Sequence, residues 1–246
     1  MLYGDKKRAL YECWLAYWPI IDDENYNAYI SCAILEACFF KLDEIRRSWR
    51  VATFKGKPAI ELSARLNINP EIYDVAFIDL VLQHIETGRY AILENKTTSS
   101  RLNDVTPMYK NSSQSIGYSI ILDAIAGAEL TAFDTNYLVA QQKNKLLTDL
   151  VVHWLPFKRS IMDRLNWFLT LGMDIKHLQD MQKMNYFPMR NACQAFNSTC
   201  GFFGTCELRR TDVPRIQEPD PTVYDFEFFL DDIVADHIRR VKEVLG

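Results

Sequence analysis

Residues 75–98 read VAFIDLVLQHIETGRYAILENKTT, and this stretch indicates the core of the fold. Its two apolar runs, at residues 75–82 and 90–98, flank a turn that contains Gly88. Short apolar runs bounded by turn residues are typical of buried strands. The stretch therefore predicts a β-hairpin whose two strands are both buried.

Strand-like and helical patterns continue on both sides of this hairpin. Apolar residues recur at helical spacing in the first fifty residues, and short strand-like runs begin at Trp49. Further strands are expected at residues 50–54, 59–67, 137–142 and 151–157, and further helices at 113–126, 161–184 and 226–245. Residues 99–112 are polar and contain Pro107, which predicts a flexible loop, and residues 213–223 predict a linker.

Composition places the chain among globular proteins. It has 246 residues, of which 48% are hydrophobic, and this permits one large domain or two small ones. The N-terminus is charged and no run of about eighteen apolar residues occurs, so we expect a cytoplasmic protein without a membrane span. The net charge of -4 disfavours a broad nucleic-acid-binding surface but allows a local basic cleft.

Three ionisable residues interrupt the apolar hairpin: Asp79 in its first strand, and Glu94 and Lys96 in its second. A buried carboxylate is costly unless it is paired, hydrogen-bonded or bound to a cation. Residues two apart on a strand share a face, so Glu94 and Lys96 point the same way, and Asp79 can join them if the hairpin pairs. Two carboxylates suit Mg²⁺ or Mn²⁺, and an ammonium group can orient an attacking water or stabilise charge on a phosphate. The alternative is a buried salt bridge between Lys96 and one of the acids.

Three short motifs in this order resemble a known nuclease family. Residues 78–81 are Ile-Asp-Leu-Val, residues 94–98 are Glu-Asn-Lys-Thr-Thr, and residues 114–118 have the pattern Gln-x-x-x-Tyr. Together they resemble the PD-(D/E)XK nuclease superfamily, in its RecB-like exonuclease branch of phages and recombination systems. The resemblance covers residues 4–208 and implies an α/β fold with a restriction-endonuclease-like core, a central mixed β-sheet flanked by helices. It also implies one domain over residues 1–246, with its catalytic core at about 50–157.

The resemblance assigns roles to individual residues. The residues expected to act in catalysis are Asp79, Glu94, Lys96, Gln114 and Tyr118. Asp79 and Glu94 would bind Mg²⁺ or Mn²⁺ together with the backbone carbonyl of Asn95, and Lys96 would orient the attacking water. The glutamine and the tyrosine lie four residues apart on one helix face and would contact substrate or support the site. Glu61 stands where relatives often carry another acid, and its alternative interpretation is an ordinary surface glutamate.

The cysteines fall into an N-terminal and a C-terminal group. They are Cys13, Cys32 and Cys38 near the start, and Cys193, Cys200 and Cys206 near the end. Members of the family often bind a [4Fe–4S] cluster through one N-terminal and three C-terminal cysteines. The resemblance therefore implies such a cluster on the C-terminal three, within residues 187–208. Zinc and free thiols are the alternatives.

The start of the chain departs from the family pattern. Relatives carry Gly-x-x-x-His, whereas here Gly4 is followed by Arg8, so a histidine metal ligand is missing. The chain starts at this motif, without the preceding helix that carries the first cysteine in relatives. This favours either an N-terminally trimmed member or a different fourth cluster ligand, for which Cys13, Cys32 and Cys38 are the candidates.

These features predict a metal-dependent deoxyribonuclease, either an exonuclease or an enzyme that processes DNA ends in phage or bacterial recombination or repair. The partners implied are DNA and a recombination or helicase protein. Arg8 favours the alternative, a catalytically inactive nuclease-fold module that binds DNA. A structural metal protein, in which the acids form only salt bridges, is a third interpretation. The sequence does not indicate the oligomeric state.

Overall fold

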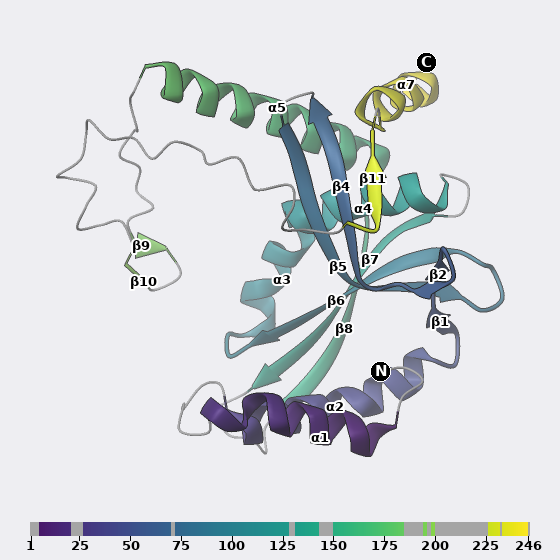
Figure 1. The fold of residues 1–246 in the computed structure, drawn as a ribbon, viewed down its shortest axis with the longest axis vertical. Coiled ribbons are helices and arrows are strands. Elements are labelled where there is room, and N and C mark those ends of the chain that lie inside the picture. Colours follow the sequence, from purple (N-terminus) through teal and green to yellow (C-terminus); the bar gives the residue numbers. More distant parts are fainter. Residues whose placement is uncertain are drawn as a thin grey trace. The chain divides into compact units, whose positions relative to one another are not determined.

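A mixed sheet of seven strands, counted among the described residues, lies in the first of the chain's two units (Figure 1). The computed structural model describes residues 5–20, 27–69, 72–127, 131–142, 150–184, 194–195, 198–199, 226–231 and 233–245. The first unit comprises Met1–Leu165 and Phe226–Gly246, and the second comprises Asn166–Asp225. The chain is thus an α/β protein with a central mixed sheet packed against helices, while the single nuclease-like domain stays a prediction.

The strands of this sheet lie in the order β11-β4-β5-β6-β7-β8, and β1 pairs with β5 outside that path. Their bounds are β1 (Trp49–Val51), β4 (Ile60–Asn69), β5 (Ile72–His84), β6 (Tyr90–Thr98), β7 (Thr131–Gln142), β8 (Leu150–Lys158) and β11 (Phe228–Leu230). Antiparallel pairing joins β4 to β5 and β5 to β6, which confirms the predicted hairpin. The strands β6 and β7 are parallel, and β7 pairs with β8 in the antiparallel direction.

Short pairs of strands complete the β structure. The run predicted at 50–54 is divided between β1 and β2 (Thr53–Phe54), and β2 pairs with β3 (Lys57–Pro58). This turn places Lys55 and Gly56 at positive φ, 49° and 77°, a conformation that glycine adopts without steric cost. In the second unit, β9 (Gln194–Ala195) pairs with β10 (Ser198–Thr199).

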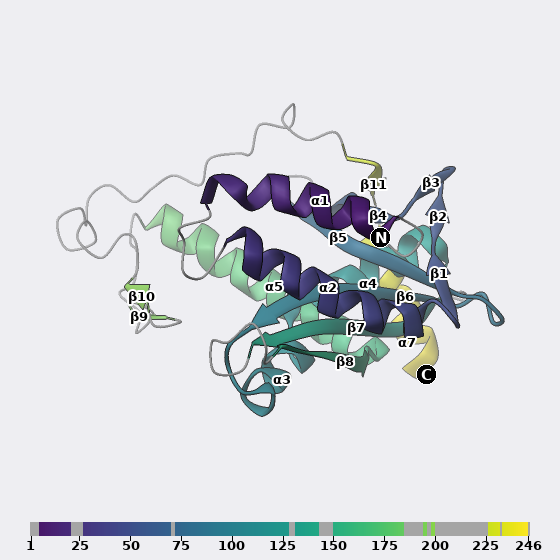
Figure 2. The ribbon, with the colours of Figure 1, turned by 90° about the horizontal axis from the view of Figure 1, so that it is seen from below.

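Two helices cover one face of the sheet. Helices α1 (Lys6–Tyr17) and α2 (Ala28–Ile45) pack together, η1 (Trp18–Ile20) follows α1, and α2 lies against β7 and β8 (Figure 2). The core contact joins three α2 residues to three sheet residues, namely Phe39, Leu42 and Ile45 with Leu82, Leu93 and Leu138. Full burial of such side chains stabilises a fold by about 1.5–3 kcal/mol each. These contacts confirm the helices predicted in the first fifty residues.

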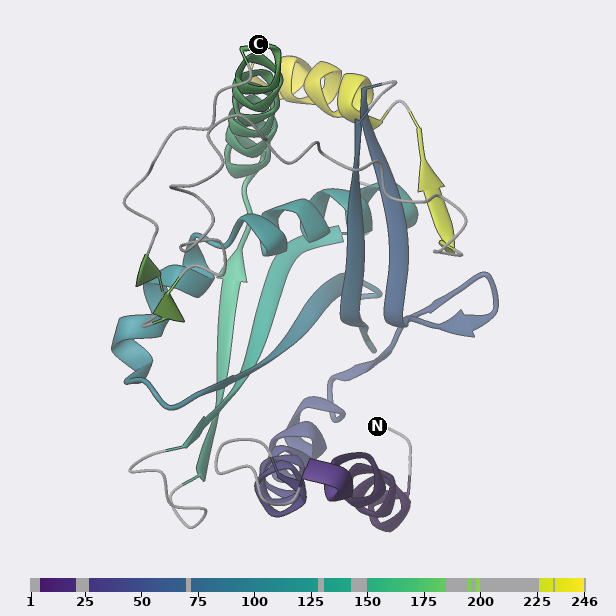
Figure 3. The same ribbon diagram turned by 60° about the vertical axis from the view of Figure 1, so that its left-hand side comes forward.

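The opposite face of the sheet carries α4 (Ser113–Ala126), which connects β6 to β7 and packs on both (Figure 3). Successive strand residues point to opposite faces, so Leu93 faces α2 whereas Glu94 faces α4. The bounds of α4 match the predicted helix, and Ser112 caps it by accepting a hydrogen bond from the backbone N–H of Ser115 at 3.4 Å.

The prediction of a loop at residues 99–112 is wrong, because this segment contains α3 (Leu102–Lys110). Its partly buried residues are Leu102, Val105, Thr106 and Tyr109, which recur at helical spacing. Pro107 removes one backbone donor, but the amphipathic spacing and the packing of this face outweigh that loss. A polar composition and one proline therefore do not exclude a helix in this segment.

The C-terminal tail also differs from its prediction as one helix over 226–245. The strand β11 comes first and pairs in parallel with β4, and α7 (Ile233–Leu245) follows. The tail is tied to the unit by polar contacts as well, because Asp123 of α4 accepts hydrogen bonds from Arg240 at 2.6 Å and from Arg164 at 2.9 Å. Asp123 has only 2% of its surface exposed, so these charges are paired in the interior.

Arg240→Ala is expected to lower the free energy of unfolding by about 1.5–3 kcal/mol, because it removes a charged hydrogen bond to a buried carboxylate. Denaturation in urea measures this. Arg239→Ala is the matched control, since Arg239 is 60% exposed and pairs with Asp236 and Glu243 at the surface. Its loss is expected to change the free energy of unfolding much less, because exposed ion pairs contribute little. Equal losses for the two variants would show that Arg240 does not anchor α7.

The predicted helix at 161–184 is confirmed as α5 (Ile161–Lys183), which crosses from the first unit into the second. Within the described part of the chain, every helix is too short or too polar to cross a membrane.

Candidate active site

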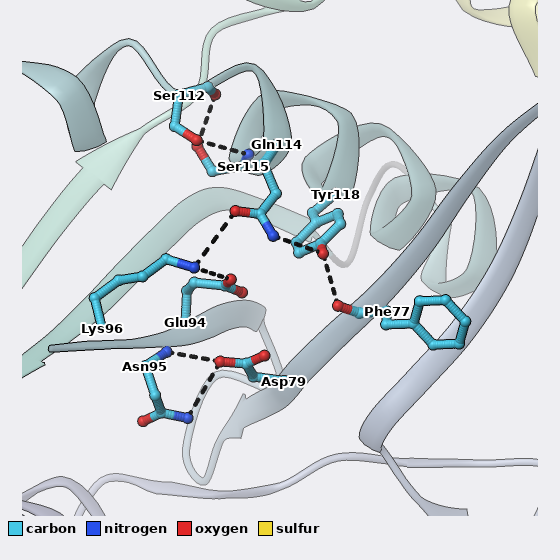
Figure 4. Close-up of polar contacts among 9 residues, drawn as sticks. All are labelled: Phe77, Asp79, Glu94, Asn95, Lys96, Ser112, Gln114, Ser115 and Tyr118. Carbon is cyan, nitrogen blue, oxygen red and sulfur yellow. Dashed lines mark hydrogen bonds and ion pairs between the residues drawn. The ribbon is translucent and has the colours of Figure 1, made fainter. Parts of the chain in front are cut away.

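The candidate site begins where the pairing of β5 with β6 ends (Figure 4). The last pair of that ladder is Leu80 with Leu93, so Asp79 and Glu94 follow as the next residues of their strands. Asp79 Oδ2 accepts a hydrogen bond from the backbone N–H of Asn95 at 2.8 Å, and Asn95 Nδ2 lies 3.4 Å from the same oxygen. The carboxylate thus replaces a backbone acceptor beyond the end of the ladder. The register brings the two predicted acids to the same level of the sheet.

Glu94 is almost completely buried, with 3% of its side chain exposed. Its Oε1 accepts a hydrogen bond from Lys96 Nζ at 2.7 Å, as expected for residues two apart on one strand face. Its Oε2 is also buried and has no hydrogen-bond partner among the described residues. A buried carboxylate oxygen is costly without a hydrogen bond or a cation, so this atom fits as a ligand for a divalent ion.

Electrostatics at Glu94 agree with this interpretation. Burial raises the pKa of Glu94 above its ordinary value, and the hydrogen bond from Lys96 offsets part of that shift. The charges of Asp79 and Glu61 raise the pKa of Glu94 further, so both acids lie within electrostatic reach of it. A cation beside these carboxylates would stabilise their charged forms.

Glu61 has features of both predicted roles, an additional acid of the site and an ordinary surface glutamate. It is exposed, as a surface glutamate would be, but the register of β4 with β5 places it opposite Asp79, between the pairs Ile60–Leu80 and Leu62–Ile78. Its φ of 51° is left-handed, a conformation that costs a residue with a Cβ about 1–2 kcal/mol. Acids on three neighbouring strands therefore lie at one level of the sheet.

The first turns of α4 supply the polar residues that face Lys96. Gln114 Oε1 lies 3.5 Å from Lys96 Nζ, and Gln114 Nε2 donates to the hydroxyl of Tyr118 at 2.9 Å. Tyr118 in turn donates to the backbone carbonyl of Phe77 at 2.6 Å. A continuous chain of contacts thus runs from Glu94 through Lys96 and Gln114 to Tyr118 (Figure 4). The i, i+4 spacing of the Gln-x-x-x-Tyr pattern produces this alignment.

Two further residues near the site were not identified from the sequence. Tyr109 of α3 stacks on Tyr137 of β7 with ring centroids 4.9 Å apart, and the charge of Lys96 influences its pKa, which burial raises. Arg159, which follows β8, is 3% exposed and contacts α3 and α4. The sequence could have indicated Tyr109, because it continues the helical spacing of the partly buried residues of α3. No local pattern indicates a role for Arg159.

The carboxylates alone do not form a complete metal cage. No group of three or more His, Cys, Asp or Glu side chains is placed to hold a metal ion among the described residues. Asp79 and Glu94 stay the predicted carboxylate ligands, and Mg²⁺ is an ion that binds one or two carboxylates and keeps several waters. The Asn95 carbonyl stays a predicted third ligand.

The cysteine cluster stays a prediction, because Cys193, Cys200 and Cys206 lie outside the described residues, as does Gly4. The other three cysteines are free thiols. Burial raises the pKa of both Cys13 and Cys38 to about 11, and a hydrogen bond with Cys32 contributes to the shift at Cys13. Arg8 is exposed on α1 and pairs with Glu12 at 3.8 Å.

Comparison with known proteins gives no assignment: no protein-family model matches the chain, and no curated protein matches it in sequence.

Proposed function

We propose that this chain is a metal-dependent DNA nuclease with a restriction-endonuclease-like core, a member of the PD-(D/E)XK superfamily in its RecB-like exonuclease branch. The observation that carries the proposal is the environment of Glu94, a buried carboxylate with one oxygen bound to Lys96 and the other without a hydrogen-bond partner in the described part of the chain. A salt bridge alone would satisfy only the first oxygen. A divalent ion would satisfy the second and offset the repulsion from Asp79.

Asp79 and Glu94 would hold Mg²⁺ or Mn²⁺ at the point where β5 and β6 cease to pair. A metal ion bound there would polarise the scissile phosphodiester and lower the pKa of an attacking water. Asp79 is oriented for this role by its hydrogen bond from Asn95, and Glu94 is oriented by Lys96. Preorganised ligands of this kind need little rearrangement before the reaction.

Lys96 would orient the attacking water and stabilise negative charge on the phosphate. The side chain of Lys96 is 31% exposed, so it would reach solvent and substrate while its ammonium group contacts Glu94 and Gln114. Gln114 and Tyr118 would keep the ammonium group aligned, because they link it to the backbone of β5. These contacts leave donor capacity on Lys96 for a substrate oxygen.

The order of elements supports the proposed core. The antiparallel strands β4, β5 and β6 are followed by α4 and by β7, which is parallel to β6. Glu61, Asp79 and Glu94 lie at one level of these three neighbouring strands, and Gln114 of the crossover helix faces Lys96. The support for the proposed restriction-endonuclease-like core thus comes from the order of the strands and from the order of the motifs.

Cleavage of end-labelled single- and double-stranded DNA and of RNA, in Mn²⁺, Mg²⁺ or EDTA, tests the proposal. We expect DNA cleavage that requires the metal and stops in EDTA. Binding of DNA without cleavage in either metal would favour the inactive DNA-binding module instead. Absence of both binding and cleavage would remove the support for either function.

A further inference from the structure

Arg159 is a fully interior cation that the proposed chemistry does not use. It follows β8 and is 3% exposed. Buried arginines are rare unless their donors are satisfied, and here several donors have partners. A buried arginine with these hydrogen bonds therefore has a structural role, which its partners define.

The partners of Arg159 come from three elements. Its Nε donates to Thr135 Oγ1 of β7 at 2.9 Å. Its Nη2 donates to the backbone carbonyl of Tyr109 at 2.9 Å and to Ser115 Oγ at 2.6 Å, and its Nη1 donates to the carbonyl of Lys110. The guanidinium thus fastens the corner between α3 and α4 to the sheet.

The chemistry of this contact suits an arginine. Tyr109 and Lys110 end α3, and the last carbonyls of a helix lack partners within the helix and carry partial negative charge. Ser115 lies in the first turn of α4, so one planar group holds the end of one helix and the start of the next. A lysine has three donors on one atom and cannot span these positions in the same way.

The corner that Arg159 holds carries two residues beside Lys96. Gln114 precedes Ser115 directly and lies 3.5 Å from Lys96 Nζ, at the outer limit of a hydrogen bond. Tyr109 is close enough to Lys96 for that charge to influence its pKa. A small outward shift of the corner would break the contact between Gln114 and Lys96. Asp79 and Glu94 lie on strands and would not move with it.

We propose that Arg159 is a positioning residue, which sets the cleavage rate by holding the α3–α4 corner so that Gln114 aligns Lys96. The inference depends on the proposed nuclease function. In this proposal the strands of the sheet carry the metal ligands, whereas the α3–α4 corner carries the residue that aligns Lys96. Loss of Arg159 therefore affects the chemical step and leaves metal binding intact.

A double-mutant cycle of Arg159→Lys and Gln114→Ala, measured as single-turnover DNA cleavage in saturating Mn²⁺, tests this inference. Arg159→Lys alone is expected to lower the rate constant roughly 10–100-fold, because small misplacements of reacting groups have effects of that size. In the Gln114→Ala protein the same change is expected to cost less than about twofold, because coupled residues are not additive. The stabilisation of Arg159→Lys by Mn²⁺, read from thermal unfolding, is expected to equal that of wild type.

Two further variants keep the test decisive. Ser115→Ala removes one contact of Arg159 and is expected to lower the rate in the same direction but less, should Arg159→Lys not fold. Arg50→Lys, at an exposed arginine bound to Gln83, is the control and is expected to cleave like wild type. Wild-type rates in Arg159→Lys, or additive losses in the double variant, would overturn the positioning role. No metal-dependent cleavage by the wild-type protein would instead refute the proposed function itself.

Discussion

Glu94→Gln is expected to abolish both metal-dependent cleavage and metal-dependent stabilisation. The change removes the charge of a buried ligand and leaves the shape of the side chain nearly unchanged. Metal ions contribute several kcal/mol of transition-state stabilisation, so the rate constant should fall roughly 10³-fold or more. At a metal concentration about 100 times its Kd, binding stabilises a folded protein by about 2.7 kcal/mol, and this gain should be absent in the variant.

The same substitution is expected to raise stability in metal-free buffer at neutral pH. The pKa of Glu94 is raised in the folded chain, mainly by burial, so the folded protein keeps this proton to a higher pH than the unfolded chain does. The stability associated with the protonated carboxyl is present at acid pH and is lost as the pH rises through the raised pKa. The advantage of glutamine therefore develops as the pH rises from the ordinary glutamate pKa to the raised one, and it is complete above the raised pKa.

Thermal unfolding with Mn²⁺ and with EDTA, at acid and at neutral pH, measures both effects. Asp43→Asn is a useful control, because pairing with Lys6 lowers the pKa of Asp43, so the sign is opposite. We expect that variant to lose some stability at neutral pH and to respond to Mn²⁺ like wild type. A Glu94→Gln protein that kept the full response to Mn²⁺ would show that Glu94 is not a metal ligand.

Lys96→Met is expected to lower the cleavage rate constant by roughly 10²–10³, the usual effect of removing one preorganised charged donor. Methionine keeps the length of the side chain but cannot orient water or contact the phosphate. The metal should still bind, since Asp79 and Glu94 remain. The DNA concentration for half-maximal rate should change little, because the ammonium acts mainly on the reacting phosphate.

Lys57→Met provides the matched control for this change, because Lys57 is exposed in β3, a short strand that pairs only with β2 among the described residues. It is expected to cleave at the wild-type rate. Rate constants are measured under single-turnover conditions, with the DNA and metal saturating for each variant. A Lys96→Met protein that cleaved within a few-fold of wild type would exclude Lys96 from the chemical step.

Local patterns in the sequence predicted most of the sheet. The hairpin at 75–98 and the helix at 113–126 follow from short-range rules, turn residues in one case and the local pattern of apolar residues in the other. The β-strand β11 could not be predicted in this way, because its partner β4 lies more than 160 residues away, as the pair Phe228–Ala64 shows. The helix α3 differs from the predicted loop because a proline inside a helix costs one backbone donor but does not end the helix when one face is packed, as the helical spacing of the partly buried residues shows.

The candidate site also contains some residues that local sequence rules place and others that only long-range contacts place. The two-residue alternation puts Glu94 and Lys96 on one strand face, where they form an ion pair, and the register of β5 with β6 brings Asp79 level with Glu94. Both features are readable from the sequence. The left-handed backbone of Glu61 and the contacts of Arg159 are not, since they depend on segments that meet only in the folded chain.

The most direct test of the account is a time course of end-labelled DNA with the wild-type protein in Mn²⁺, beside Asp79→Asn protein purified in the same way. We predict that wild type shortens the DNA, that EDTA stops the reaction, and that the variant leaves the DNA intact while unfolding at a temperature similar to that of wild type. Equal cleavage by both proteins, or cleavage that continues in EDTA, would contradict a metal-dependent nuclease site built on Asp79, Glu94 and Lys96.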